Sequence, residues 1–182
     1  MRLPLFLYKF ADMKKIVHIL VFMAASLCLA GCIKDRIVGA DLKVGDRIPD
    51  FSVVMNNGTV VSDESLEGKV SCIVFFHTSC PDCQQTLPVV QDIYDRYAVE
   101  GVEFALISRE QPGSDIVPFW DEKGLDMPYS GQITRTVYNK FAGTRIPRVY
   151  ICDKDGIIRY IFTDDPIPSY DDLMSSLESL IR

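Results

Sequence analysis

The chain has 182 residues, of which 19 are basic and 25 are acidic, so its net charge is −6 at pH 7. This length holds a leader and one ordinary domain. The surplus of acidic side chains argues against nucleic acid as a partner and against electrostatic adhesion to a membrane, because both require a basic surface. The composition therefore indicates one acidic globular domain behind a leader.

The amino end has the parts of an export signal. Two lysines after Met13 form a positive region, an apolar stretch follows, and the sequence Leu-Ala-Gly-Cys occupies residues 29–32. The apolar run over residues 16–31 is shorter than the ~20 residues that a membrane-spanning helix needs. We interpret residues 1–31 as a signal peptide that truly starts at Met13, because a proline and an aspartate interrupt the segment before it. An uncleaved membrane anchor is the alternative.

The small residues before Cys32 resemble the lipobox of bacterial lipoproteins, in which the cysteine is lipidated and becomes the first residue. The resemblance implies lipidation at Cys32 and a tether over residues 32–42. Removing residues 1–31 takes away four basic side chains and one acidic side chain, which changes the net charge to −9. The lipid alone would then hold the protein at a membrane of the cell envelope, facing the periplasm or the exterior.

The remaining residues alternate between strand and helix patterns. The almost wholly apolar segments 70–77 and 102–108 are typical of strands buried on both faces. In chain order we expect a hairpin over 51–62, a helical turn at 65–69, the strand 70–77, a helix from Pro81, the strand 102–108, helices over 114–123 and 133–143, a hairpin of strands 148–152 and 157–162, and a last helix capped by Ser169. This order predicts an α/β domain over residues 43–182, with a mixed central sheet, helices on both faces and an N-terminal β-hairpin.

Cys80 and Cys83 form a Cys-Pro-Asp-Cys motif between a buried strand and the helix that follows it. This context makes a Cys-x-x-Cys pair specific. Cys80 would lie where free N–H groups and the positive helix end favour its thiolate, and Pro81 suits the first helical position. Cys83, one turn further on, would be more buried. The motif therefore predicts thiol–disulfide exchange, with Cys80 attacking and Cys83 resolving the mixed disulfide.

Other uses of the pair are weaker. Structural zinc needs four ligands, but the mature chain has a single histidine, His77, and the cysteines Cys72 and Cys152 are isolated on expected strands as small buried residues. A Cu(I) carrier could use two thiolates and His77, and it stays the alternative. A peroxidase is disfavoured, because His77 stands where peroxiredoxins have a threonine three residues before the reactive cysteine. Thiol exchange itself requires no metal or cofactor.

Several motifs are similar to the TlpA-like branch of the thioredoxin fold, which is akin to the ResA-type reductases. They are VGDRIPDF, SLEGK, VFFHTSCPDC and TRIPRVYICDKDG, and the resemblance covers residues 43–182. These relatives are exported or membrane-tethered thiol–disulfide oxidoreductases. The resemblance implies a cis bond at Ile146–Pro147, which would face the cysteines and bind substrate, and an insert near residues 109–131. It also implies disulfide-bonded exported proteins as clients and a transmembrane thiol electron donor as partner. A binding protein that has lost turnover is the alternative.

The chain departs from the family near the cysteines. Ser79 stands where a tryptophan is usual, Thr86 where ResA-type relatives have a glutamate, and Val74 where thioredoxins have a buried acid. These positions therefore provide no proton acceptor for Cys83. Glu110 is the candidate substitute, with a solvated surface acid as the alternative.

Three charged or titratable residues modify the expected site. His77 would favour the Cys80 thiolate when protonated, or it would be a strand-end residue with no redox role. Asp82 places a negative charge near Cys80, which disfavours the thiolate and makes the pair more reducing. We therefore expect a reductant. Arg148 replaces the threonine that commonly follows the cis-proline, and we expect it to favour acidic partners.

Overall fold

The computed structural model describes residues 41–182. The predicted signal peptide, the start at Met13 and the lipidated Cys32 lie outside these residues. Within residues 41–182, no helix combines the length and hydrophobicity needed to cross a membrane.

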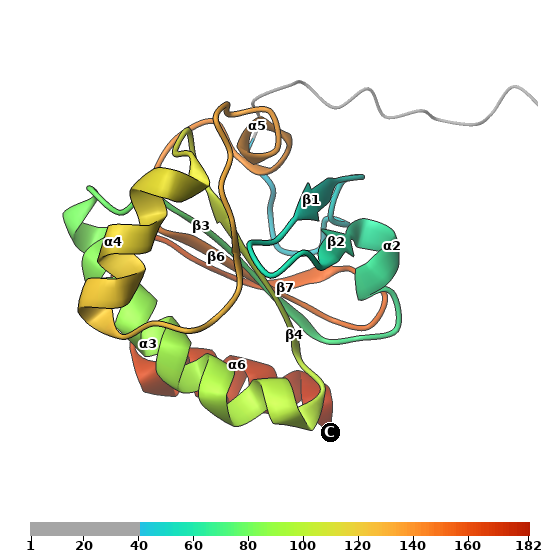
Figure 1. Cartoon of the computed structure of the whole chain (residues 1–182). Helices are drawn as coiled ribbons and strands as arrows, with labels where there is room; N and C mark the ends of the chain where they lie inside the picture. Colours follow the sequence, from blue (N-terminus) through green and yellow to red (C-terminus); the bar gives the residue numbers. More distant parts are fainter. Residues whose placement is uncertain (1–40) are drawn as a thin grey trace, which may run out of the picture. The chain divides into compact units, whose positions relative to one another are not determined.

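Seven strands and five α-helices lie within residues 41–182, and Figure 1 shows their arrangement. The sequence predicted six of these strands, but it did not predict the short strand Tyr129–Ser130. The strands are β1 (Ser52–Val54), β2 (Val60–Ser62), β3 (Ser71–Phe76), β4 (Glu103–Ser108), β5 (Tyr129–Ser130), β6 (Arg148–Cys152) and β7 (Ile158–Phe162). The helices are α2 (Asp63–Leu66), α3 (Pro81–Tyr97), α4 (Gly113–Lys123), α5 (Tyr138–Phe141) and α6 (Tyr170–Ile181), with a 3-10 turn over Ala98–Glu100. Ser169 caps α6 as predicted, because its hydroxyl accepts the N–H of Asp172.

The main sheet has five strands in the order β5-β4-β3-β6-β7. β3 runs parallel to β4 and antiparallel to β6, β4 and β5 are parallel, and β6 and β7 form an antiparallel hairpin. β1 and β2 form a separate antiparallel hairpin. The mixed sheet and the N-terminal hairpin are therefore confirmed.

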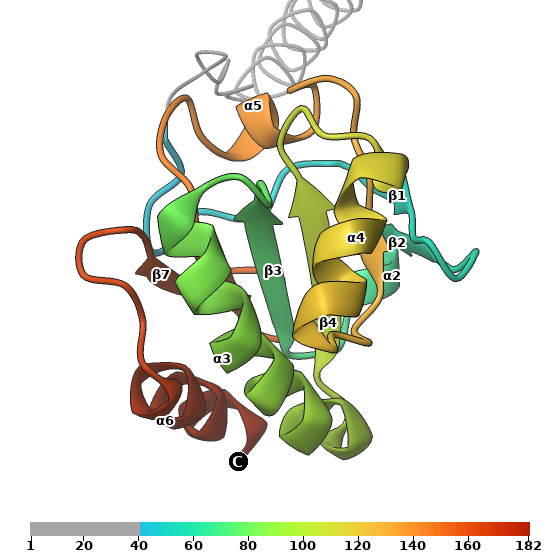
Figure 2. The same cartoon turned by 60° about the vertical axis from the view of Figure 1, so that its left-hand side comes forward.

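Neighbouring side chains of β3 fill the two halves of the core. The ring of Phe75 lies 4.9 Å from that of Phe141 in α5, whereas the ring of Phe76 lies 5.1 Å from that of Trp120 in α4. Successive strand residues point to opposite faces, so α4 and α5 cover opposite sides of the sheet. Figure 2 shows α3 and α4 together in front of β3 and β4, and α6 lies beside α3. Helices on both faces are confirmed.

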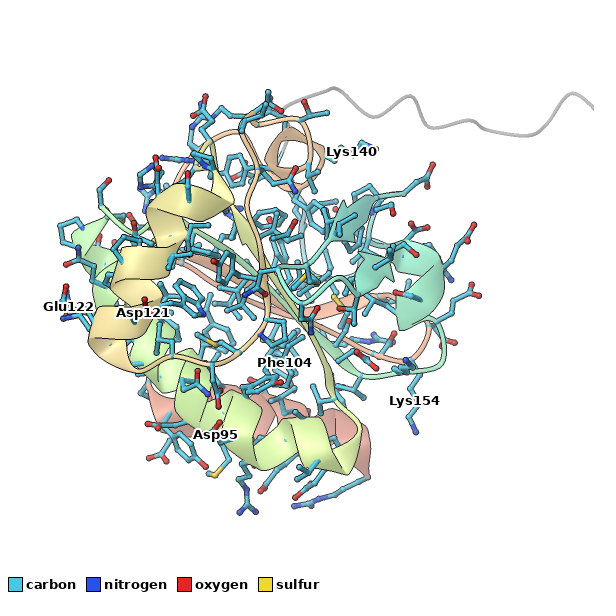
Figure 3. The ribbon with its side chains drawn as sticks, viewed as in Figure 1. Asp95, Phe104, Asp121, Glu122, Lys140 and Lys154 are labelled. Carbon is cyan, nitrogen blue, oxygen red and sulfur yellow. The ribbon has the colours of Figure 1, made fainter. Side chains whose placement is uncertain are left out.

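Aromatic packing also joins α3 to the sheet. Phe104 of β4 meets the ring of Tyr94 edge-on, with 5.2 Å between centroids, and Figure 3 shows Phe104 inside the domain. Glu122 and Lys154 lie at its periphery (Figure 3). The acidic surplus is thus carried on the outside of an apolar core.

The predicted helix over 133–143 is wrong in its length, because only Tyr138–Phe141 are helical. The hydroxyl of Thr134 lies 3.4 Å from the N–H of Thr136 and accepts its hydrogen bond. Such local side-chain bonds give the backbone an alternative to the helix, and they delay its start.

Asp41 fastens the start of the described chain to the loop before β6. Its carboxylate accepts the N–H of Gly143 at 2.8 Å and pairs with the Arg148 guanidinium at 2.8 Å. The N–H of Leu42 donates to the carbonyl of Phe141. Arg148 is only 4% exposed, so the prediction that it selects acidic partners is wrong. Its side chain lies on the inner face of β6 and cannot reach a client.

Replacing Asp41 with alanine should destabilise the domain, because the buried guanidinium of Arg148 loses its partner. We expect the free energy of unfolding to fall by about 1–2 kcal/mol, a value reduced for the partial exposure of Asp41. Urea unfolding measures this, with Glu122→Ala, which breaks an exposed ion pair, as the control.

The effect of Asp41→Ala should also depend on pH. Burial acts to raise the pKa of Asp41, but the Gly143 N–H and the Arg148 guanidinium outweigh it and hold the pKa below its usual value. The ionised carboxylate therefore stabilises the fold above its ordinary pKa, and this contribution is lost as the pH falls through the lowered pKa. If wild type and variant still differ in their free energy of unfolding in strong acid, this assignment is wrong.

Candidate active site

Three chain segments meet at one edge of the main sheet. Residues 77–80 follow β3, residues 109–110 follow β4, and residues 145–146 precede β6. Parallel β3 and β4 end at this edge and antiparallel β6 begins there, which is where ligands bind in open α/β sheets. Figure 2 shows this edge beside α5. The segments surround a hollow of about 520 Å³, lined by His77, Ser79, Cys80, Arg109, Glu110, Arg145 and Ile146.

Cys80 lies at the start of α3 as predicted. It is the N-cap residue, and Pro81 follows at the first helical position. The backbone N–H of Cys80 donates to the carbonyl of His77 at 3.0 Å. Its Sγ is half-buried and lies 3.5 Å from the carbonyl oxygen of Ile146. The sulfur therefore faces the hollow, at the amino end of α3.

Cys83 is fully buried one turn further along α3. Burial raises the pKa of its thiol, whereas a hydrogen bond from the His77 backbone and the charge of Arg109 act in the opposite direction. Both cysteines are free thiols in this structure. The deeper sulfur is thus held protonated until its neighbour has reacted, which suits a resolving cysteine.

The bond between Ile146 and Pro147 is cis, as the resemblance implied. Ile146 lines the hollow, and Pro147 is buried next to it at the start of β6. A second cis bond, at Asp165–Pro166, was not predicted and lies outside the hollow.

His77 lines the hollow, and its ring is neutral near neutral pH. Partial burial and the nearby Arg109 lower the pKa of the ring, so the neutral form dominates. Its Nδ1 lies 2.9 Å from the Ser79 hydroxyl and 3.2 Å from the Ser79 N–H, which donates to it. Any effect of a protonated His77 on Cys80 is therefore confined to acidic solution. Asp82 lies in the first turn of α3 and does not line the hollow.

Two arginines that the sequence analysis did not identify, Arg109 and Arg145, line the hollow. Arg109 directly follows β4, and its guanidinium lies 5.5 Å from the ring centroid of Tyr138. Arg145 has a φ of 69° and makes a 3.3 Å contact with Asp164. The sequence shows that a basic residue, Arg109, follows a buried strand. It does not show that this residue lies near Cys80.

Gln111 was also missed, although it fixes the loop that carries Cys80. Its Oε1 accepts the N–H of Thr78 at 2.9 Å, and its Nε2 donates to the Thr78 hydroxyl at 2.5 Å. Gln84 donates to the Thr78 carbonyl at 2.8 Å. Every polar group of the buried Thr78 is therefore bonded, and the loop is tied to both the segment after β4 and helix α3.

No carboxylate replaces the missing buried acid near Cys83 at the expected positions. Val74 is fully buried, and the Thr86 hydroxyl donates to the carbonyl of Asp82. Glu110 is half-exposed and pairs with Arg135 at 2.9 Å. Across residues 41–182, no three His, Cys, Asp or Glu side chains are grouped so that they could hold a metal ion.

The fold and the site together define a thioredoxin-like protein. A Cys-x-x-Cys pair at a helix start lies beside a cis-proline, at the edge of a mixed five-stranded sheet. Residues 44–161 match the AhpC/TSA family, and the chain belongs to this family.

Named relatives carry the same resemblance. The chain is 26% identical over 137 residues to the thiol-disulfide oxidoreductase ResA of Geobacillus thermodenitrificans, which covers 75% of this chain and 78% of the relative. It is 24% identical over 115 residues to ResA of Bacillus thuringiensis, covering 63% of this chain and 66% of that relative. The predicted similarity to ResA-type oxidoreductases is therefore confirmed.

A solved structure supports the fold. The thiol:disulfide interchange protein of Chlorobium tepidum superposes with a TM-score of 0.65 at 23% identity, covering 79% of this chain and all of that chain. At this identity the likeness establishes the thioredoxin-like architecture.

Replacing Gln111 with alanine should loosen the loop that carries Cys80. The Thr78 N–H would lose its acceptor, and an unpaired buried group of this kind lowers the free energy of unfolding by about 1–3 kcal/mol. Hydrogen exchange at the Thr78 amide should accelerate, as measured by NMR. Gln132→Ala is the matched control, because Gln132 donates to Ser130 and does not touch Thr78. Equal protection of Thr78 in both variants would refute the assignment.

Proposed function

We propose that the protein is a cell-envelope thiol–disulfide oxidoreductase that reduces disulfides of exported proteins through Cys80 and Cys83. The observation that carries this proposal is the contrast between the two sulfurs: Cys80 faces the hollow, and Cys83 is fully buried one turn behind it. The names of the ResA relatives support the activity, and the export signal expected from the sequence supports a place in the cell envelope.

The exchange takes place in two balanced steps. The Cys80 thiolate attacks one sulfur of the client disulfide, which forms a mixed disulfide and releases the other client sulfur as a thiolate. Cys83 then loses its proton and attacks the Cys80 sulfur, so that a Cys80–Cys83 disulfide forms and the second client sulfur leaves. Two electrons pass from the pair to the client. The released client sulfurs take up the proton of Cys83 and one proton from solvent, which offsets the proton lost when the Cys80 thiolate formed.

The remaining partners follow from this chemistry. The oxidised pair must be reduced again, and a transmembrane thiol electron donor is the proposed source of the electrons. The client chain would lie against Ile146 and Pro147, next to the attacking sulfur.

Replacing Cys83 with serine should trap the first intermediate. Cys80 can still attack, but nothing resolves the bond, so mixed disulfides with client proteins should accumulate. They are measured as adducts on non-reducing gels that disappear when a reductant is added. Cys80→Ser is the matched control and should give none. Adducts on the Cys80 variant would reverse the two roles, and their absence from both variants would count against exchange with proteins.

We also propose that Cys32 carries the membrane anchor. Replacing Cys32 with serine should move the protein from the membrane to the soluble fraction, because a mature chain with a net charge of −9 is not attracted to anionic lipid. Fractionation and metabolic labelling with a fatty acid measure this. A Cys32→Ser protein that stays in the membrane would support the uncleaved anchor instead.

A further inference from the structure

The charges around the hollow do not cancel. Glu110 pairs with Arg135 at 2.9 Å, and Arg145 pairs with Asp164 at 3.3 Å. Arg109 differs: no carboxylate of residues 41–182 lies within ion-pair distance of its guanidinium. The wall around Cys80 therefore carries one positive charge that the described part of the domain leaves unmatched.

The unmatched guanidinium is held in place. The backbone N–H of Arg109 donates to the carbonyl of Phe76 at 2.7 Å, at the end of β3. Its guanidinium lies over the ring of Tyr138, 5.5 Å from the ring centroid, and the Tyr138 hydroxyl donates to the carbonyl of Arg145 at 2.6 Å. A planar guanidinium fixed against an aromatic ring loses little freedom when it binds a carboxylate. Arg109 is thus positioned to bind an anion in the hollow that Cys80 also lines.

The position of this charge is unusual for the domain. Residues 41–182 contain 13 basic and 23 acidic side chains, so the domain as a whole repels anions. His77, which also lines the hollow, is neutral near pH 7 and adds no positive charge. Any attraction for an acidic group is therefore local to the hollow, and it acts only on a segment already placed next to Cys80.

We propose that Arg109 selects clients with an aspartate or glutamate next to the cysteine that Cys80 attacks. This inference rests on the proposed function and names the substrate class of the same site. A residue one or two positions from that cysteine lies within about 4–7 Å along the chain, and Cys80 and Arg109 line the same hollow. Arg145 contributes less to this selection, because its positive charge is already paired with the carboxylate of Asp164.

The test uses peptides that differ in one residue. Three disulfide-linked peptides carry glutamate, glutamine or lysine beside the same cysteine, and each is mixed with the pre-reduced full-length protein in detergent. The second-order rate constant of a single turnover needs no electron donor. We expect the glutamate peptide to react about fivefold faster than the glutamine peptide, as for one charge-assisted hydrogen bond at a half-exposed site, and the lysine peptide to react slowest.

Variants then locate the effect. In Arg109→Gln the ratio of the glutamate rate to the glutamine rate should fall to about one, whereas Arg109→Lys should keep part of the preference because it keeps the charge. Arg145→Gln should reduce the ratio less. Arg182→Gln removes the same charge from the exposed carboxyl terminus and should leave the ratio unchanged. The ratio cancels any effect of Arg109 on the thiols themselves, because both peptides meet the same variant.

The outcomes separate this inference from the proposed function. If no peptide is reduced, the proposed function fails. If the glutamine peptide is reduced and the wild type shows no preference for glutamate, the function stands and the acidic selection is refuted. A preference that survives Arg109→Gln would assign it to another residue. High salt should shrink the wild-type ratio, since the pairing is electrostatic and half-exposed.

Discussion

Strand β3 pairs with β4 on one side and with β6 on the other, and this double pairing places every part of the candidate site. All six of its residues are buried, and Phe75 and Phe76 fill opposite halves of the core. The parallel pairing with β4 brings residue 109 to the edge where β3 ends. The antiparallel pairing with β6 brings residue 146 to the same edge, with Phe75 directly opposite Arg148. A slip of either pairing would turn the facing side chains to the wrong side of the sheet.

The elements that the sequence predicts well are those whose signal is local. The apolar run of β3, the cap at Ser169 and the helix start after Cys80 each depend on neighbouring residues, and each is found where expected. The helix before Gly143 is shorter than its apolar spacing suggests, because the Thr134 hydroxyl bonds the backbone instead. The spacing of apolar residues does not reveal whether a side-chain hydroxyl will bond the backbone in place of the helix.

The residues that surround the two cysteines depend on register, which the sequence alone does not reveal. Arg148 was expected to meet the client, but its position opposite Phe75 turns it inward to Asp41. Arg109 and Gln111 lie far from Cys80 in sequence and reach its loop only because β4 pairs with β3. The chemistry of the pair was therefore predictable from its motif, whereas the charge and the rigidity of its surroundings required the structure.

The inward turn of Arg148 also connects the amino end of the domain to the candidate site. Asp41 is held by Arg148 and by the Gly143 N–H, at the edge of the sheet where β6 begins and where Cys80 faces its hollow. Asp41 is nine residues on from Cys32, which is at most about 30 Å of extended chain. If Cys32 carries the proposed anchor, this length limits how far Asp41 can lie from the membrane surface.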